Sequence, residues 1–299
     1  MKTAMCLIKR NIKLFFKDKG MFFTSLITPA ILLVLYATFL ANVYKDSYTA
    51  GLPEGLSLSD SIINGLVGGQ LVSSILAVSC VTVAFCSNFL MVQDKASGIS
   101  KDFYVSPVKA STMSLCYYVA NLITTLIVCF TAAALCFGYI AIVGWYMSFA
   151  DVLLLLLDVF ILVLFGSALS SVINYFLSTQ GQISAVGTII SAGYGFVCGA
   201  YMPISSFSEG LQTVVKFLPG TYGTSLLRNH ALGGVMKAME EDGIPKQVID
   251  SLMDMQDCNL YFGETLVETP VMYIILVSSV VLLVGAYVLL NLFSKKQKS

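Results

Sequence analysis

Long apolar stretches dominate this chain, and short polar stretches separate them. A helix needs about 20 mostly apolar residues to cross the hydrocarbon core of a bilayer. Proline is well tolerated at the first position of a helix, and Thr269 followed by Pro270 is therefore a plausible start for the last stretch. The pattern predicts an all-α membrane protein with one transmembrane domain over residues 1–299. Its six predicted spans lie at about residues 20–43, 62–91, 113–139, 150–173, 183–202 and 270–293, the fifth stopping at Pro203.

The first 19 residues have a different pattern, in which apolar and basic residues alternate in small groups. Leu7, Ile12 and Phe15 are interleaved with Lys9 and Lys13. A helix with an apolar side and a lysine-rich side lies in the interface of a membrane, with its charges toward the lipid headgroups. We therefore predict an interfacial helix over residues 1–19; the alternative is a plain basic flank of the first span.

The basic residues are distributed unevenly between the predicted loops. Of the 17 Lys and Arg residues, 12 fall in the four segments 1–19, 92–112, 174–182 and 294–299. These segments share one side of the membrane if six spans are present. Because cytoplasmic loops carry an excess of Lys and Arg, both termini are predicted to be cytoplasmic in a multi-pass protein of the cell membrane.

Composition supports the membrane class and argues against several others. The chain is 57% hydrophobic and 11% charged, whereas about a quarter of a soluble domain is charged. The net charge is zero, which gives no reason to expect a nucleic acid partner, and membrane lipids are the expected surroundings. The eight cysteines form no metal-binding spacing, so no metal site is predicted.

The sequence shows no catalytic motif. It has no phosphate-binding loop of the form GxxxxGK[ST], so we expect no enzyme activity and no cofactor bound by this chain. The string Leu66–Gln70 resembles an ATPase signature, but it lies inside a predicted span, where its glycines are expected to allow close helix packing. His230 is the single histidine and is expected in a polar loop outside the membrane.

Among the residues of the predicted spans, Asp158 costs the most free energy to place inside the membrane. A carboxylate at the centre of a spanning helix costs roughly 2.5–3.5 kcal/mol, so it is expected to face protein or water. Asp151 lies two turns earlier on the same face, and no Lys or Arg lies in a spanning core to pair with Asp158. It is expected to be protonated or bonded to a hydroxyl such as that of Thr124 or Tyr118. Both a structural link between helices and an ion or substrate path remain open.

Small and weakly polar residues form a stripe along the fifth predicted span. They recur at helical spacing, which places them on one face. Such a face either packs against another helix or lines a translocation path, and a dimer seam would serve as both. The stripe comprises Ser184, Thr188, Ser191, Gly195 and Gly199, and the second span adds Ser79 and Thr82.

Two of the connections between spans are more than simple loops. The segment 92–112 contains a short stretch with the aromatic residues Phe103 and Tyr104, which ends at Pro107. The region 203–268 is the largest outside the spans and begins with an apolar stretch at 207–218. That stretch is too short to span a membrane and is predicted to be re-entrant or interfacial.

The order of these features resembles the ABC-2 type permeases, the membrane subunits of ATP-driven exporters. Three regions carry the resemblance, which covers essentially the whole chain. They are the basic segment ending Phe15-Phe16-Lys17-Asp18-Lys19, the loop Asp94-Lys95-Ala96-Ser97-Gly98-Ile99 with Tyr104-Val105-Ser106-Pro107-Val108, and Gly199-Ala200-Tyr201-Met202-Pro203 followed by Phe217-Leu218-Pro219-Gly220-Thr221-Tyr222 and Leu227-Arg228.

The resemblance implies a division of labour between subunits. A separate ABC ATPase subunit, which binds ATP and Mg, would dock on the loop at 94–107, and a second permease chain would complete the path as a homo- or heterodimer. The implied substrate is a drug, antimicrobial peptide, lipid or other amphipathic molecule. An ion-coupled carrier or channel that uses Asp158 is the alternative. The residues implied to couple to the ATPase are Asp94, Lys95, Gly98, Ile99, Phe103, Tyr104, Ser106 and Pro107, and those implied in the re-entrant segment are Pro203, Glu209, Pro219 and Arg228.

Overall fold

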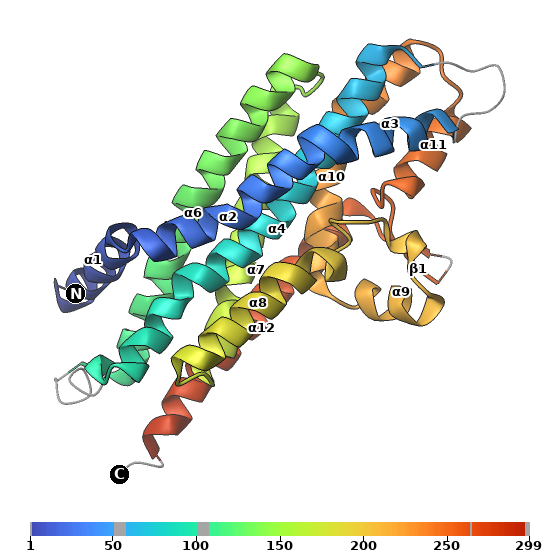
Figure 1. The fold of residues 1–299 in the computed structure, drawn as a ribbon. Coiled ribbons are helices and arrows are strands. Elements are labelled where there is room, and N and C mark those ends of the chain that lie inside the picture. The colour runs from blue at the N-terminus through green and yellow to red at the C-terminus, as the bar shows by residue number, and fades with distance from the viewer. Residues whose placement is uncertain (1, 51–57, 101–107, 264, 297–299) are drawn as a thin grey trace.

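The computed structural model describes residues 2–50, 58–100, 108–263 and 265–296 (Figure 1). Long helices lie side by side in one bundle, and shorter helices gather at one end of it. We call the other end the terminal end, because it carries the N-terminal helix and the last turns of the C-terminal helix. The described segments that end at residue 100 and resume at residue 108 also have these ends there.

The N-terminal segment is helical, as its pattern predicted. Helix α1 spans Lys2–Lys17, and Asn11 and Phe15 are its buried residues. It packs mainly against α6 (Ala110–Val143) and also against α2 (Lys19–Leu35). Part of its inward side therefore faces protein.

The first predicted span continues further than expected. After α2, the chain forms a π-helical turn at Tyr36–Leu40 and then α3 at Ala41–Ala50. Pro29 lies inside α2, where it removes one backbone hydrogen bond. The helical run thus extends past the predicted end at residue 43.

Helix α4, which spans Asp60–Ala96, is the centre of the bundle. Its 37 residues give a length of about 55 Å at 1.5 Å per residue, well beyond the thickness of a hydrocarbon core. Helices α2, α6, α7 (Phe149–Tyr175), α8 (Gln180–Val197) and α10 (Pro219–Glu241) all pack against it. As a result, nearly every side chain of α4 is buried by protein.

The outer helices expose apolar side chains to their surroundings. Ile142 of α6 and Phe149 of α7 are among the most exposed, and α12 (Thr269–Lys296) exposes a row along its length. A face of this kind is stable in lipid and not in water. Five helical runs of the described residues are long and apolar enough to cross a membrane: Lys19–Thr49, Asp60–Ala96, Ser111–Val143, Phe149–Tyr175 and Thr269–Leu292.

The fifth predicted span is shorter than expected. Helix α8 has 18 residues and ends at Val197 rather than at Met202 before Pro203. Gly199 adopts a left-handed conformation with a φ of 73°, and the N–H groups of Ala200 and Tyr201 both donate to the carbonyl oxygen of Gly195. A left-handed glycine after the last turn is a common helix terminator, so the chain turns before the proline.

The region after α8 holds more regular structure than the sequence indicated. The short helices are η2 at Ile204–Ser206, α9 at Glu209–Lys216 and α11 at Lys246–Met255. The strands β1 (Tyr261–Phe262) and β2 (Thr265–Leu266) form an antiparallel pair. The apolar stretch 207–218 therefore forms α9, with Glu209 as its first residue, and Pro203 precedes η2.

Helix α10 is the largest element that the hydropathy pattern missed. Pro219 is its first residue, and most of its side chains are buried against α4, α7 and α12. Glycines allow this packing: a Cβ on Gly69 would lie 2.5 Å from a methyl group of Leu232, and one on Gly223 would lie 2.5 Å from Leu162. The expectation that a glycine within 66–70 eases close helix packing is confirmed at Gly69.

Candidate functional site

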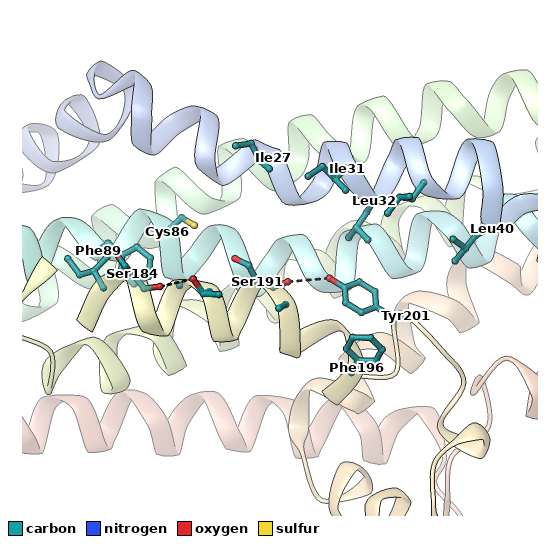
Figure 2. A pocket seen from close by; sticks show the side chains of 15 residues that line it. Ile27, Ile31, Leu32, Leu40, Cys86, Phe89, Ser184, Ser191, Phe196 and Tyr201 are labelled. Atoms are coloured by element: carbon teal, nitrogen blue, oxygen red, sulfur yellow. Dashed lines mark hydrogen bonds between the residues drawn. The ribbon is translucent and has the colours of Figure 1, made fainter. Parts of the chain in front are cut away.

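An apolar groove of about 900 Å³ lies between α2 and α8, with α4 at its floor (Figure 2). None of the described residues that line it is charged. Helix α8 gives the groove its polar atoms, and α2 gives it a wall of branched aliphatic side chains. The lining residues are Ile27, Ile31, Leu32, Leu35, Leu40, Cys86, Phe89, Ile183, Ser184, Gly187, Thr188, Ser191, Ala192, Phe196 and Tyr201.

Three members of the predicted stripe face this groove. The hydroxyl of Ser184 donates to the carbonyl oxygen of Gln180. The hydroxyl of Thr188 donates to the carbonyl oxygen of Ser184 (Figure 2). Ser191 accepts a hydrogen bond of 3.4 Å at its carbonyl oxygen from the hydroxyl of Tyr201. A hydroxyl that donates within its helix still has acceptor lone pairs to offer, so the groove presents weak acceptors within an apolar wall.

The other predicted path residues lie elsewhere. Gly195 is covered by the ring of Tyr201, and Gly199 ends the helix. Ser79 and Thr82 are buried inside the bundle, where their hydroxyls donate to carbonyl oxygens of their own helix. Hydroxyls that donate within their own helix are well accommodated in its buried face, so Ser79 and Thr82 contribute no polar atoms to the groove.

Two charged groups anchor the predicted ATPase-coupling loop at the terminal end. Both guanidinium nitrogens of Arg10 bond to the carboxylate of Asp94, and the hydroxyl of Tyr117 donates to the same carboxylate. The hydrogen bond to Asp94 raises the pKa of Arg10. A bidentate pair fixes geometry as well as charge, so α1, α4 and α6 are tied together at this point.

Lys95 anchors the same loop to a second place in the bundle. Its ammonium donates to the carbonyl oxygens of Asn174, Tyr175 and Leu177 at the end of α7. A cation is favourable at a helix C-terminus, where carbonyl groups have no intrahelical partner. Gly98 follows with a φ of 82°, and Ile99 is exposed. The predicted contacts Phe103, Tyr104, Ser106 and Pro107 lie outside the described residues.

The buried carboxylate Asp158 has different partners from those expected. It is 1% exposed and bonds to Nδ1 of His230 at 2.5 Å and to the hydroxyl of Tyr273 at 2.5 Å. The expected bond to a hydroxyl on another helix is confirmed, but the hydroxyl is that of Tyr273 and not that of Thr124 or Tyr118. The placement of His230 in a loop is wrong, since it lies on α10. These contacts join α7, α10 and α12, and none of the three residues lines the groove.

Asp151 does not share the environment of Asp158. Its carboxylate accepts from the backbone N–H and the hydroxyl of Ser148, while the N–H of Asp151 donates to the Ser148 hydroxyl. This reciprocal arrangement is a capping box, which stabilises the start of α7. The spacing Ser148-x-x-Asp151 was visible in the sequence and signals this cap.

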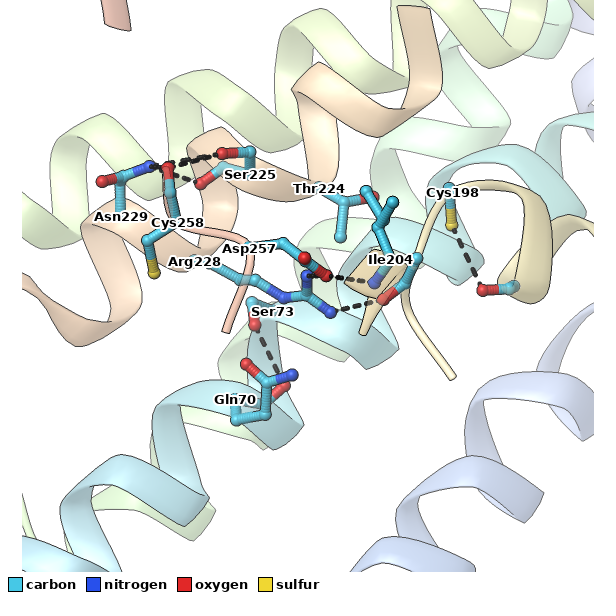
Figure 3. Close-up of polar contacts among 12 residues, drawn as sticks. Gln70, Ser73, Cys198, Ile204, Thr224, Ser225, Arg228, Asn229, Asp257 and Cys258 are labelled. Atoms are coloured by element: carbon cyan, nitrogen blue, oxygen red, sulfur yellow. Dashed lines mark hydrogen bonds and ion pairs between the residues drawn. The ribbon is translucent and has the colours of Figure 1, made fainter. Parts of the chain in front are cut away.

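Arg228 is buried in the region that the sequence assigned to a re-entrant segment (Figure 3). Its Nη1 lies 3.0 Å from Oδ2 of Asp257, and its Nη2 donates to the carbonyl oxygen of Gly199 at 2.5 Å. The carboxylate of Asp257 also accepts from the N–H of Ile204. Burial raises the pKa of Asp257, while the nearby charge of Arg228 opposes that rise. The cluster therefore holds the turn after α8 against α10.

These features define a membrane-embedded helical bundle with an apolar groove between two of its helices. Among the described residues, no group of His, Cys, Asp and Glu side chains is arranged to hold a metal ion. The family comparison agrees with this class: the family model for the ABC-2 type transporter matches residues 4–231. The chain belongs to the ABC-2 type transporter family and is a membrane transport permease. No match to a curated protein was found.

Proposed function

We propose that this chain is the permease subunit of an ATP-driven exporter, and that the groove between α2 and α8 holds the transported molecule. In this proposal a second permease chain completes the path and a separate ABC ATPase supplies the energy. Both termini lie on the cytoplasmic side, where the terminal end of the bundle meets the ATPase. The groove is the observation that carries the proposal.

The lining of the groove favours a neutral or weakly polar amphipathic substrate. A site for a charged molecule needs a paired charge, because burying an ion without one is costly. The described lining residues offer aliphatic walls and a row of Ser and Thr oxygens instead. Ligand sites of this kind are mainly apolar with a few polar groups that fix orientation.

The contacts at the terminal end support a mechanical link to an ATPase. Asp94 and Lys95, which are adjacent at the start of the coupling loop, hold that end of the loop to α1, α6 and α7 through polar contacts. A force on the loop would then move several helices together rather than bend one connection. A motion of this kind shifts the conformational equilibrium of the permease only if the ATPase makes different contacts with the two conformations of the permease.

Blocking the groove tests its role. Ala192 is exposed on α8 and lines the groove, so Ala192→Phe places a ring inside it. We expect ATP-dependent uptake of a neutral amphipathic fluorescent dye by inverted membrane vesicles to fall roughly tenfold, since overfilling a site costs about 1–3 kcal/mol. Ala185→Phe is the matched control, because Ala185 is exposed on the same helix and does not line the groove.

The outcomes separate the parts of the proposal. Equal uptake in the two variants and the wild type would remove the groove from the path. If the purified chain never associates with an ATPase subunit, the ATP-driven exporter itself is wrong.

The Arg10–Asp94 contact provides a second test at the terminal end. Arg10→Gln breaks a bidentate pair, whereas Lys13→Gln removes the same charge from an exposed position of α1. We expect Arg10→Gln to lower ATP-dependent uptake severalfold while ATP hydrolysis by the complex continues, and Lys13→Gln to retain both. Equal uptake by the two variants would show that this contact does not take part in coupling.

A further inference from the structure

A small polar cavity lies where α1, α4 and α6 meet, and it shares no lining residue with the apolar groove. The space in it that is open to the centre of a water molecule is about 10 Å³, which is room for about one water. Tyr117 lines the cavity and donates to Asp94, so the cavity lies beside the Arg10–Asp94 contact. The polar lining residues that matter here are Asn11 of α1, Ser87 and Asn88 of α4, and Thr124 of α6.

Asn11 contributes a donor to this cavity. It lies one turn before Phe15, and both are buried residues of α1. The side-chain oxygen of Asn11 accepts from Nη1 of Arg10 at 2.9 Å, which distinguishes that oxygen from the amide nitrogen. The amide nitrogen Nδ2 makes no hydrogen bond to any residue that the structure describes. Because Asn11 is only 4% exposed, this donor needs a partner inside the protein.

Asn88 contributes an acceptor to the same cavity. Its Nδ2 donates to the hydroxyls of Ser170 and Ser171 at 3.1 and 3.0 Å. Both hydroxyls donate in turn to the carbonyl oxygen of Ser167, so they accept from Asn88 and fix the orientation of its amide. The oxygen Oδ1 of Asn88 then accepts no hydrogen bond from a described residue, although Asn88 is only 2% exposed.

The hydrogen-bonding groups and the charge of the lining identify what fits this cavity. Nδ2 of Asn11 and Oδ1 of Asn88 both retain surface that a water molecule can touch. The hydroxyl of Thr124 donates to its own helix, so Ser87 donates to Thr124 and keeps a lone pair for another donor. None of the described lining residues is charged, and an ion is costly to bury without a paired charge. A neutral molecule that accepts one hydrogen bond and donates two matches these three groups.

We propose that the cavity binds one ordered water molecule that bridges α1 and α4. The water accepts from Nδ2 of Asn11 and donates to Oδ1 of Asn88 and to the hydroxyl oxygen of Ser87. Buried waters typically make about three hydrogen bonds, and a bridging water is nearly as favourable as a direct bond. The site therefore adds a second polar link between α1 and α4, and it explains why an asparagine is buried on the inward side of α1. It does not depend on the proposed transport function.

A structure of the purified full chain, at a resolution that shows ordered water, tests the site directly. We expect one density peak within hydrogen-bonding distance of Nδ2 of Asn11, Oδ1 of Asn88 and the hydroxyl of Ser87. A cavity without a peak, or a direct hydrogen bond between Asn11 and Asn88, would overturn the proposal.

Thermal unfolding provides a second measurement. Asn11→Leu keeps the branched shape of the side chain and removes both amide atoms, so Oδ1 of Asn88 loses its bridge. The melting temperature should fall by about 2–12 °C, the effect of leaving a buried polar group unpaired. Asn291→Leu is the matched control, because the amide of Asn291 donates within its own helix and does not line the cavity. Its melting temperature should stay within about 2 °C of the wild type.

The salt used in the same assay distinguishes water from a cation. With water in the site, the wild type should melt at the same temperature in sodium chloride and in N-methylglucamine chloride of equal concentration. A stabilisation by sodium that Asn11→Leu abolishes would overturn the proposal and assign the cavity to a cation. An unchanged melting temperature of Asn11→Leu would also contradict the bridge.

Discussion

Arg228→Met is expected to be one of the most destabilising single changes in this protein. The arginine is 1% exposed, and its guanidinium bonds to the carboxylate of Asp257 and to the carbonyl oxygen of Gly199. Methionine fills much of the same space but offers no donor. The change therefore leaves the Asp257 charge buried without its partner and leaves the Gly199 carbonyl without this donor.

The structure allows the size of the effect to be estimated. Removing one partner of a buried ion pair typically costs about 3–5 kcal/mol, because the remaining charge is uncompensated. At about 2–4 °C per kcal/mol, the melting temperature should fall by about 6–20 °C. Asp257→Asn should cost less, since the asparagine oxygen can still accept from the Ile204 N–H and Arg228 keeps its bond to Gly199.

Thermal unfolding of the purified chain in detergent measures these differences. The double variant Arg228→Met with Asp257→Asn should lose less than the sum of the single variants, because no unpaired charge remains. Lys237→Met is the control, since Lys237 is an exposed cation on the same helix. A melting temperature of Arg228→Met within about 2 °C of the wild type, or strictly additive single changes, would refute the reasoning.

Three further predictions concern Asp158, two adjacent glycines of α10 and the pH dependence of Asp257. Asp158→Asn should lower stability by about 1–3 kcal/mol and retain ATP-dependent dye uptake; lost uptake at an unchanged melting temperature would favour the ion-coupled alternative. Gly234→Ala should lower the melting temperature, because its Cβ would lie 2.0 Å from the carbonyl oxygen of Tyr146, whereas Gly233→Ala meets nothing closer than 3.7 Å and should be neutral or stabilising. Burial raises the pKa of Asp257. At a pH just above the ordinary pKa of a carboxyl group, Asp257 is therefore still protonated in the native state but ionised in the unfolded chain. The contribution of Asp257 to stability should thus fall as the pH rises through that window, and Asp257→Asn should remove this slope in pH-dependent melting curves.

Part of the candidate site was predictable from periodicity. Ser184, Thr188 and Ser191 recur at helical spacing, and the structure places all three along the groove. The spacing could not show what faces them. The aliphatic wall of α2 belongs to a segment about 160 residues earlier in the chain, and the contact between the two exists only in the folded bundle.

The lack of information on tertiary contacts also explains why the sequence analysis misplaced His230 and did not find the partners of Asp158. His230 lies in a stretch rich in Gly, Ser and Thr that has too little apolar character to read as a spanning helix. The stretch nevertheless forms α10, because small residues let it pack closely against α4 and α7. Once α10 is in place, His230 meets Asp158, and a costly carboxylate gains two partners that local sequence does not reveal.

The sequence by itself determined the class of this protein, the position of most long helices and the amphipathic character of α1. These properties follow from the transfer of each segment between water and lipid, which depends on composition along a continuous stretch of chain. The tertiary structure alone decided which polar groups are paired, which hydroxyls reach the groove and where α8 stops. Those outcomes depend on contacts between segments that are distant in sequence. Hydropathy does not reveal these contacts, whereas small residues allow the close helix packing that brings the segments together.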